Sequence, residues 1–221
     1  MHYYSFIPLR AGSKGLRNKN ILKLNKKELY LYSVEQALRT SDKCFISTDI
    51  ESILIKEFKS NINVIKRPNK LAGDEILMRD VVLDFLSNTP HKDFNMILLQ
   101  ATSPLRSDAD IQNCKKLFDS GKYSMVISVS KKNKASTKYG FLKGEKFSPF
   151  FEEYLFNNRQ NIPDVYGPNG AIYIFNARDF LKLRTFPNRD IGSYVIPLER
   201  SLDIDTKDDF KLAENHIAAN Y

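Results

Sequence analysis

Residues 3–20, YYSFIPLRAGSKGLRNKN, join an apolar run directly to a loop rich in glycine and basic side chains. The aromatic and β-branched run at 3–9 is typical of a buried strand. Gly12 and Gly15 follow it and let backbone N–H groups approach an anion. The loop matches neither GxxxxGK[ST] nor GxGxxG. It predicts a phosphate-binding turn, with an ordinary basic turn as the alternative. The basic residues are Arg10, Lys14, Arg17 and Lys19.

Length and composition describe an ordinary globular chain. Its 221 residues are 42% apolar and 27% charged, enough for one large α/β domain with a core. It has no run of 18 apolar residues. Its N-terminus lacks the features of a signal peptide, so we expect no membrane partner and a cytoplasmic location. Cys44 and Cys114 lie far apart with no CxxC, which indicates two buried thiols.

The net charge of +8 and the pI near 9.3 favour a polyanionic partner. Nucleic acid and small phosphorylated substrates are both compatible with this charge, but lysines are scattered over the chain and no RRM, KH or C₂H₂ pattern occurs, which is typical of a solvated surface. Our overall prediction is a protein without a nucleic-acid partner. A non-catalytic nucleotide- or RNA-binding protein is the rival class. It predicts an affinity that falls steeply with salt.

After the opening loop, short apolar runs alternate with amphipathic segments, which predicts a mostly parallel sheet covered by helices on both faces. We expect further strands at 44–48, 62–66, 95–100, 124–130, 170–175 and 194–198. We expect helices at 29–40, 50–58, 78–86, 108–118 and 208–217. Weak periodicity at about 131–165 indicates an insertion, used for substrate covering or subunit contact, within a single domain spanning 1–221.

Distinctive polar clusters follow several of these strands: RAGSKGLRNKN, STD, QATSPLR and SLDID. In open α/β sheets ligands gather at the carboxyl ends of strands, so we expect the clusters to meet in one crevice. Asp203 and Asp205 are two residues apart, and on extended backbone both carboxylates would face one way, which suits Mg²⁺. The alternative is that Asp205 or Thr206 only caps the last helix.

Other polar residues have a functional and a structural interpretation. Gln100 can contact an amide or hydroxyl of a substrate, or it can be a turn residue whose side chain forms hydrogen bonds within the protein. Tyr173 is a core residue by default, and Arg67 and Asp74, taken alone, are surface charges.

These clusters together resemble the acylneuraminate cytidylyltransferases, also called CMP-sialic acid synthetases. The resemblance runs from Ile7 to about Asn215. RAGSKGLRNKN is similar to the family's nucleotide loop, QATSPLR to its middle motif, RQNIP with PNGAIYI to its sugar-site region, and SLDIDT to its metal motif. Lys19-Asn20 favours the sialic-acid group over the Kdo cytidylyltransferases, whose loop typically ends in GKPL.

The resemblance implies a Rossmann-like nucleotidyltransferase fold, a homodimer joined through the insertion, and a reaction. CMP would pass from CTP to the anomeric hydroxyl of a nine-carbon α-keto acid sugar, with release of pyrophosphate. Mg²⁺, or Mn²⁺, would be held by Asp203 and Asp205. The implied catalytic residues are Arg10, Lys19 and Asp205. The implied nucleotide-binding residues are Arg10, Ala11, Gly12, Ser13, Lys19, Asn20, Arg67 and Asp74. The implied sugar-binding residues are Gln100, Lys138, Arg159 (from the partner subunit) and Tyr173.

Some positions depart from the family pattern. The loop has Ala11-Gly12 where Gly-Gly is frequent, and Arg17 where Pro is frequent. Ala101 replaces a usual Pro. Glu75, Ile76, Leu77 and Met78 replace hydroxyl residues expected near the nucleotide. The acceptor sugar is not specified by these motifs, so legionaminic, pseudaminic or another ulosonic acid is the alternative.

Overall fold

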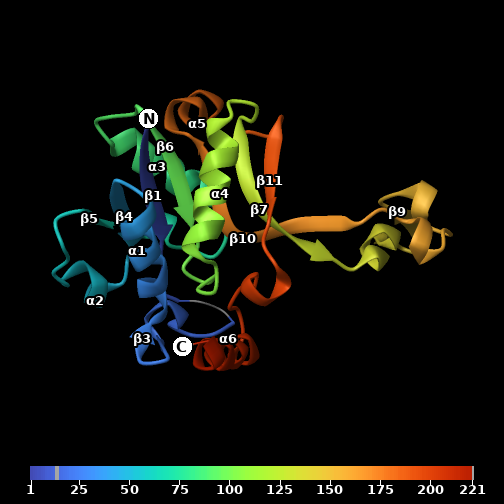
Figure 1. Cartoon of the computed structure of the whole chain (residues 1–221), viewed down its shortest axis with the longest axis horizontal. Coiled ribbons are helices and arrows are strands. Elements are labelled where there is room, and N and C mark those ends of the chain that lie inside the picture. Colours follow the sequence, from blue (N-terminus) through green and yellow to red (C-terminus); the bar gives the residue numbers. More distant parts are fainter. Residues whose placement is uncertain (13–14, 221) are drawn as a thin grey trace.

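A computed structural model gives the fold and describes residues 1–12 and 15–220. Seven strands form one central sheet in the order β11-β7-β10-β6-β1-β4-β5 (Figure 1). Six strands run in one direction, and only β10 is antiparallel to its neighbours, so the predicted mostly parallel sheet is confirmed. The strands are β1 (His2–Pro8), β4 (Lys43–Thr48), β5 (Ile62–Lys66), β6 (Phe94–Leu99), β7 (Met125–Lys132), β10 (Val165–Asn176) and β11 (Ile191–Val195).

Helices cover both faces of this sheet, as predicted. On one face α1 (Leu29–Thr40) and α4 (Asp108–Asp119) bury apolar residues at helical spacing, such as Tyr30, Val34 and Ala37 of α1. On the other face lie α3 (Met78–Asn88) and α5 (Ala177–Leu183). α6 (Lys207–Asn220) packs Ala213 and Ile217 beside the small hairpin of β2 (Lys23–Leu24) and β3 (Lys27–Glu28).

Several elements differ from the sequence-based prediction; β10, for example, begins at Val165 rather than at 170. The helix expected at 50–58 is only α2 (Glu51–Leu54), and Ile55, which directly follows it, is 74% exposed. The last strand ends at Val195 rather than 198, since Pro197 has no N–H for the ladder. α5 was not expected, although Asn176 caps it by accepting from two backbone N–H groups.

Residues 133–164, which we call the arm, leave the sheet between β7 and β10 and project from the body (Figure 1). The arm occupies the stretch whose sequence shows weak periodicity. It contains a two-stranded sheet of β8 (Gly140–Lys143) and β9 (Lys146–Pro149). Its 3₁₀ helices are η3 (Lys134–Lys138), η4 (Glu152–Tyr154) and η5 (Arg159–Asn161), and those of the body are η1 (Lys19–Ile21), η2 (Asn69–Leu71) and η6 (Leu198–Arg200).

In the described part of the chain, no helix is both long enough and apolar enough to cross a membrane.

Candidate active site

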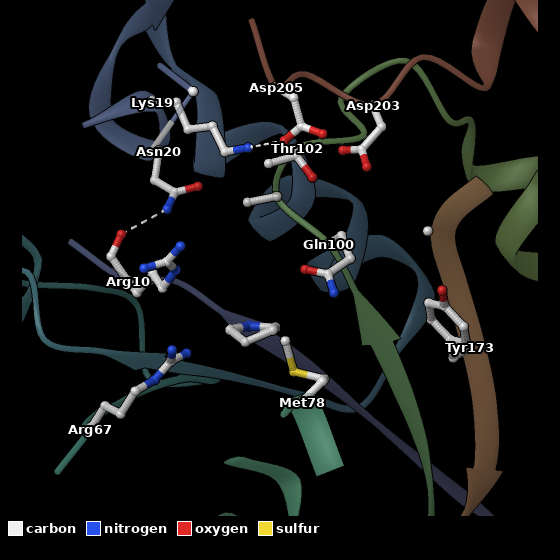
Figure 2. A pocket seen from close by; sticks show the side chains of 14 residues that line it. Arg10, Lys19, Asn20, Arg67, Met78, Gln100, Thr102, Tyr173, Asp203 and Asp205 are labelled. Atoms are coloured by element: carbon white, nitrogen blue, oxygen red, sulfur yellow. Dashed lines mark hydrogen bonds and ion pairs between the residues drawn. The ribbon is translucent and has the colours of Figure 1, made fainter. Parts of the chain in front are cut away.

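A cavity of about 470 Å³ opens where the central strands β1 and β6 end (Figure 2). Parallel strands end at the same edge of a sheet, so the loops after them converge there. Three of the four predicted polar clusters contribute side chains, as expected from their positions. The lining residues are Pro8, Arg10, Gly15, Lys19, Asn20, Arg67, Met78, Gln100, Ala101, Thr102, Gly170, Tyr173, Asp203 and Asp205.

The loop after β1 is anchored at both of its ends. The N–H of Ala11 donates to Asp49 Oδ1 at 2.7 Å, which gives the fourth cluster, STD, a role in shaping the loop. Nδ2 of the buried Asn20 donates to the carbonyl oxygen of Arg10 at 3.1 Å. Between these anchors Gly12 has a φ of 71°, a left-handed conformation that favours glycine. The loop therefore needs both its glycine and its asparagine to hold its shape.

Two arginines place positive charge on one wall of the cavity. Arg10 forms an ion pair with Asp74, and both side chains are partly exposed. Arg67 is only 4% exposed, and its Nη2 donates to the carbonyl oxygen of Ser47 at 3.0 Å. Burial lowers the pKa of Arg67 to about 10; the charge of Asp49 opposes this shift and the charge of Arg10 adds to it. Arg67 therefore remains protonated at neutral pH.

Lys19 joins the loop after β1 to the acidic segment that precedes α6. Its Nζ donates to Asp205 Oδ1 at 2.6 Å and to the carbonyl oxygen of Ile204 at 2.7 Å (Figure 2). Gly15 lies against the same segment, and a Cβ at Gly15 would overlap the carbonyl oxygen of Asp205. Motifs from opposite ends of the chain thus meet in one cavity, as the sequence predicts.

Thr206, and not the side chain of Asp205, caps α6. The N–H of Asp209 donates to Thr206 Oγ1 at 3.2 Å, and the N–H of Thr206 donates to Asp209 Oδ2 at 2.8 Å. This reciprocal pair is a capping box. The capping alternative therefore applies to Thr206, whereas the carboxylate of Asp205 is left facing Lys19.

Asp203 places a second carboxylate in the cavity, and Figure 2 shows both acids close to Thr102. Although Asp203 is accessible from the open cavity, protein atoms surround it, and this desolvation raises the pKa of its carboxyl group. A hydrogen bond with Thr102 opposes the shift, while the negative charge of Asp205 adds to it. The two carboxylates therefore lie close enough for the charge of one to act on the other.

Gln100 and Tyr173 lie on the side of the cavity away from Arg67 (Figure 2). Gln100 directly follows β6, and Tyr173 comes from β10. Tyr173 is partly buried and packs near Phe186, and it also lines the cavity. Burial first, and then the charge of Asp203, raises the pKa of Tyr173. Its hydroxyl is therefore a neutral hydrogen-bond group at this wall.

The family model for Cytidylyltransferase matches residues 5–141 of this sequence. The chain is a member of the cytidylyltransferase family. It is similar to the N-acylneuraminate cytidylyltransferase of Escherichia coli O18:K1:H7, with 37% identity over 95% of this chain and 50% of that protein. It is also similar to the CMP-N,N'-diacetyllegionaminic acid synthase of Campylobacter jejuni, with 32% identity over 93% of this chain and 90% of that protein. The chain spans about half the length of the N-acylneuraminate cytidylyltransferases it matches.

The fold of this cytidylyltransferase is shared with a solved structure described as CMP:2-keto-3-deoxy-manno-octonic acid synthetase complexed with CTP. The TM-score is 0.75 at 13% identity, and the likeness covers 100% of both chains. At that identity the likeness supports the α/β fold alone.

The acid pair fits a divalent cation that a substrate helps to hold. Among the described residues, no group of three or more metal-binding side chains occurs, so Asp203 and Asp205 would supply two ligands at most. Mg²⁺ is typically bound by one or two carboxylates together with substrate phosphates and waters. The ammonium of Lys19 already places one positive charge beside Asp205.

Of the predicted site residues that the structure describes, Ala11, Gly12, Asp74, Lys138 and Arg159 are not among those that line the cavity. Ser13 lies outside the described residues. Lys138 is on the arm, where its Nζ donates to the carbonyl oxygen of Asn157 at 2.7 Å. Arg159 begins η5 and is exposed on the arm. A role for Lys138 or Arg159 therefore depends on another copy of the chain, and it stays a prediction.

Sequence reasoning missed several residues of the site. Thr102 follows the predicted strand at 95–100 within QATSPLR, so its position there was a usable signal. Met78 places a thioether in the cavity at one of the positions that depart from the family pattern. Arg106 is 2% exposed, and its Nη1 donates to the carbonyl oxygens of Gln100 at 2.7 Å and Ala171 at 3.0 Å. It therefore ties the loop after β6 to β10.

Proposed function

We propose that this protein transfers CMP from CTP to the anomeric hydroxyl of a nine-carbon α-keto acid sugar of the sialic acid type, releasing pyrophosphate. One observation carries the proposal: Lys19, on a glycine-containing basic loop, meets Asp205 in the same cavity as Asp203. The acceptor class is supported by the names of the relatives, which act on N-acylneuraminate or make a CMP-legionaminic acid.

The loop after β1 would hold the triphosphate and ribose. Backbone N–H groups near Gly12 can approach phosphate oxygens, and Arg10 and Lys19 supply charge from either end of the loop. Arg67 would lie near the cytosine, and its ties to Ser47 fix it in place. Asp74 orients Arg10 through their ion pair. The proposed nucleotide-binding set is Arg10, Ala11, Gly12, Ser13, Lys19, Asn20, Arg67 and Asp74.

The catalytic groups act by neutralising charge. The sugar hydroxyl loses its proton to water or to an aspartate of the cavity as its oxygen forms a bond to the α-phosphorus; the bond to the pyrophosphate oxygen breaks, so negative charge shifts to the leaving group. Lys19 can leave Asp205 and contact the phosphates, and Arg10 supplies a second cation. Mg²⁺, or Mn²⁺ in its place, held by Asp203 and Asp205, would offset charge on the triphosphate when bound.

The sugar would occupy the wall formed by Gln100 and Tyr173, which offer an amide and a neutral hydroxyl to its polar groups. Arg159 and Lys138 would come from a second subunit. The arm carries exposed apolar side chains, including Phe141 at 72%, Leu142 at 73% and Phe156 at 92% exposure. Such a patch supports a homodimer in which the arm of each subunit covers the partner's sugar site. The arm would then be the insertion expected at about 131–165 within a single domain spanning 1–221.

The proposal is tested by pyrophosphate release with CTP and Mg²⁺, in parallel on N-acetylneuraminic, legionaminic, pseudaminic, deaminated sialic and Kdo acceptors. We expect release with CTP and a nine-carbon acid. Release with legionaminic acid but not with N-acetylneuraminic acid would establish the second candidate, which the 32% identity to a legionaminic acid synthase favours. A salt-sensitive affinity for RNA without any release would instead favour the non-catalytic class.

A further inference from the structure

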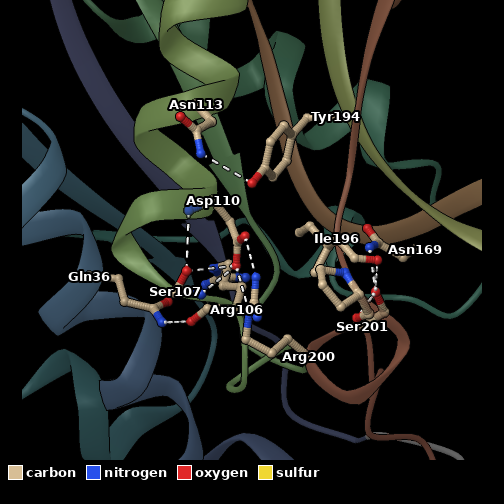
Figure 3. Close-up of polar contacts among 11 residues, drawn as sticks. Gln36, Arg106, Ser107, Asp110, Asn113, Asn169, Tyr194, Ile196, Arg200 and Ser201 are labelled. Carbon is tan, nitrogen blue, oxygen red and sulfur yellow. Dashed lines mark hydrogen bonds and ion pairs between the residues drawn. The ribbon is translucent and has the colours of Figure 1, made fainter.

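Asp110 is a buried carboxylate that lies outside the cavity. It belongs to the first turn of α4, and its side chain is 1% exposed. It accepts from the N–H and the Oγ of Ser107, both at 2.8 Å, and from Nη2 of Arg200 at 2.9 Å and Nε of Arg200 at 3.2 Å (Figure 3). Because buried charges persist only when they are paired and hydrogen-bonded, these contacts fix Arg200 relative to α4.

Arg200 lies in η6, three residues before Asp203 in the sequence. The next residue, Ser201, is held as well: its Oγ donates to the carbonyl oxygen of Ile196 at 3.0 Å and accepts from Nδ2 of Asn169 at 3.1 Å (Figure 3). The chain that carries the two acids is therefore fixed on the side that precedes them.

The acidic segment has a second attachment, which lies between the two acids. The N–H of Ile204, which lies between the two acids, donates to the carbonyl oxygen of Thr102 at 2.8 Å. Thr102 and Ser107 belong to the one loop that joins β6 to α4. The acidic segment is thus bound at two points: before the acids, Arg200 binds Asp110 in the first turn of α4, and between the acids, Ile204 binds Thr102 in the loop that precedes α4.

We propose that Asp110 and Arg200 are positioning residues that hold Asp203 and Asp205 against Thr102 and thereby set the affinity of the site for its divalent cation. The inference rests on the proposed function. Neither residue lines the cavity, so neither touches a substrate there. Their contribution to cation binding is pre-organisation. Without the Arg200–Asp110 pair, which we call the clamp, the cation must order the acidic segment as it binds.

A second arginine–aspartate pair in the first turn of α4 provides a matched control. Arg39 of α1 pairs with Asp108 through Nε at 2.5 Å and Nη2 at 3.1 Å, next to Asp110 in the first turn of α4. Arg39→Ala therefore removes an arginine–aspartate pair of the same geometry from the same turn. It leaves the acidic segment untouched. Arg200→Lys keeps the positive charge but cannot form the two parallel hydrogen bonds that Nε and Nη2 of Arg200 donate to Asp110.

The experiment compares Mn²⁺ binding, read from the electron paramagnetic resonance signal of free Mn²⁺ with and without CTP, in the wild type, Arg200→Ala, Arg200→Lys and Arg39→Ala. We expect Mn²⁺ affinity to fall by about tenfold in Arg200→Ala, to recover partly in Arg200→Lys, and to be unchanged in Arg39→Ala. The Mg²⁺ concentration for half-maximal pyrophosphate release should rise in parallel, whereas kcat at saturating Mg²⁺ should stay within about twofold.

The inference would be overturned if Arg200→Ala bound Mn²⁺ as tightly as the wild type and only unfolded at a lower temperature. It would also be overturned if Arg39→Ala lost as much Mn²⁺ affinity as Arg200→Ala. If Arg200→Ala does not fold, unchanged Mn²⁺ affinity in Arg200→Lys would do the same. Absence of Mn²⁺ binding by the wild type would overturn it too. Metal binding that depends on Arg200 in a protein that releases no pyrophosphate with any sugar would support the clamp and overturn the proposed function alone.

Discussion

Lys19 has two alternative groups of partners in the proposed reaction. In the free protein its ammonium contacts the carboxylate of Asp205 and the carbonyl oxygen of Ile204, and its side chain is 14% exposed. A triphosphate in the cavity would offer it phosphate oxygens, while a divalent cation would take its place at Asp205. One side chain can therefore compensate the acid before the substrate arrives and the phosphates afterwards.

Lys19→Ala should change cation binding and catalysis in opposite directions. Without the ammonium, Asp205 has no competing cation, so Mn²⁺ should bind more tightly in the absence of nucleotide. Turnover should fall by about tenfold or more, because a charge that stabilises the transition state is lost. Titration with Mn²⁺ and steady-state kinetics check the two effects. Unchanged turnover would remove Lys19 from the mechanism.

Gly15→Ala should separate the two motifs that Lys19 joins. A Cβ at this position would overlap the carbonyl oxygen of Asp205, so the loop or the acidic segment has to move. We expect a stability loss of about 1–3 kcal/mol, as for other overpacked sites, and a higher KM for CTP. Urea denaturation and initial-rate kinetics measure the two quantities.

Gly144→Ala is the control for the Gly15 variant, because Gly144 has a left-handed backbone (φ 59°) that a side chain strains, but it lies in open space on the arm. It should lose stability without a change in the KM for CTP. An unaltered KM in Gly15→Ala would mean that the contact between loop and acidic segment is not needed for nucleotide binding.

At the scale of the elements, the regular strands and amphipathic helices were predictable because local pattern and final environment agree. The strand at 62–66 and the helix at 29–40 have the predicted bounds. Prediction failed where a tertiary contact decides the local structure. β10 begins at Val165 because it pairs with β7 far beyond the apolar run at 170–175.

The motifs of the candidate site could be predicted from the sequence, but the buried residues that hold these motifs in place could not. The strand-end clusters containing Lys19, Gln100 and Asp203 do meet in one cavity. Arg106 and Asp110 carry no sequence signal of burial, since charged residues are rarely buried, and their partners are up to 90 positions away. Which residue caps α6 also required the hydrogen bonds between Thr206 and Asp209.

The cap of α4 predicts an acid-sensitive step in stability. Burial would raise the pKa of Asp110, but hydrogen bonds from Arg200 and Ser107 outweigh burial and leave it below 3.8. A carboxyl whose folded pKa is depressed stabilises the fold above its unfolded pKa and loses that contribution as pH falls through the folded pKa. The free energy of unfolding should therefore drop below about pH 4, with a shallower drop in Asp110→Asn.

Urea denaturation between about pH 3 and pH 6 measures this difference, and Asp108→Asn, at the exposed neighbouring pair, is the control. Parallel pH profiles for the wild type and Asp110→Asn would contradict the account of this cap.

For the whole molecule, the arm is the feature that the body does not explain. It projects from the sheet (Figure 1). It carries large exposed apolar side chains, among them Leu142 and Phe156. An isolated chain would leave this patch in water at a free-energy cost. A second copy would cover it and bring Arg159 to the cavity of its partner.

We expect a dimer in sedimentation velocity, and a monomer with a raised KM for the sugar acid when Leu142 and Phe156 are both changed to Asp. Ile55→Asp is the control, because Ile55 is 74% exposed on the body and away from the arm. It should leave the dimer intact. A monomeric wild type with full activity would remove the arm, and Arg159 with it, from the site.

The most direct test of the account follows the phosphorus atoms of CTP by ³¹P NMR in the presence of Mg²⁺ and the accepted sugar acid. CMP transfer predicts that the α-phosphorus resonance moves to a phosphodiester position as pyrophosphate appears in equal amount, and that Asp205→Asn abolishes both signals. Orthophosphate instead of pyrophosphate, or an unchanged CTP spectrum with every sugar acid, would contradict the assignment of this cavity to cytidylyl transfer.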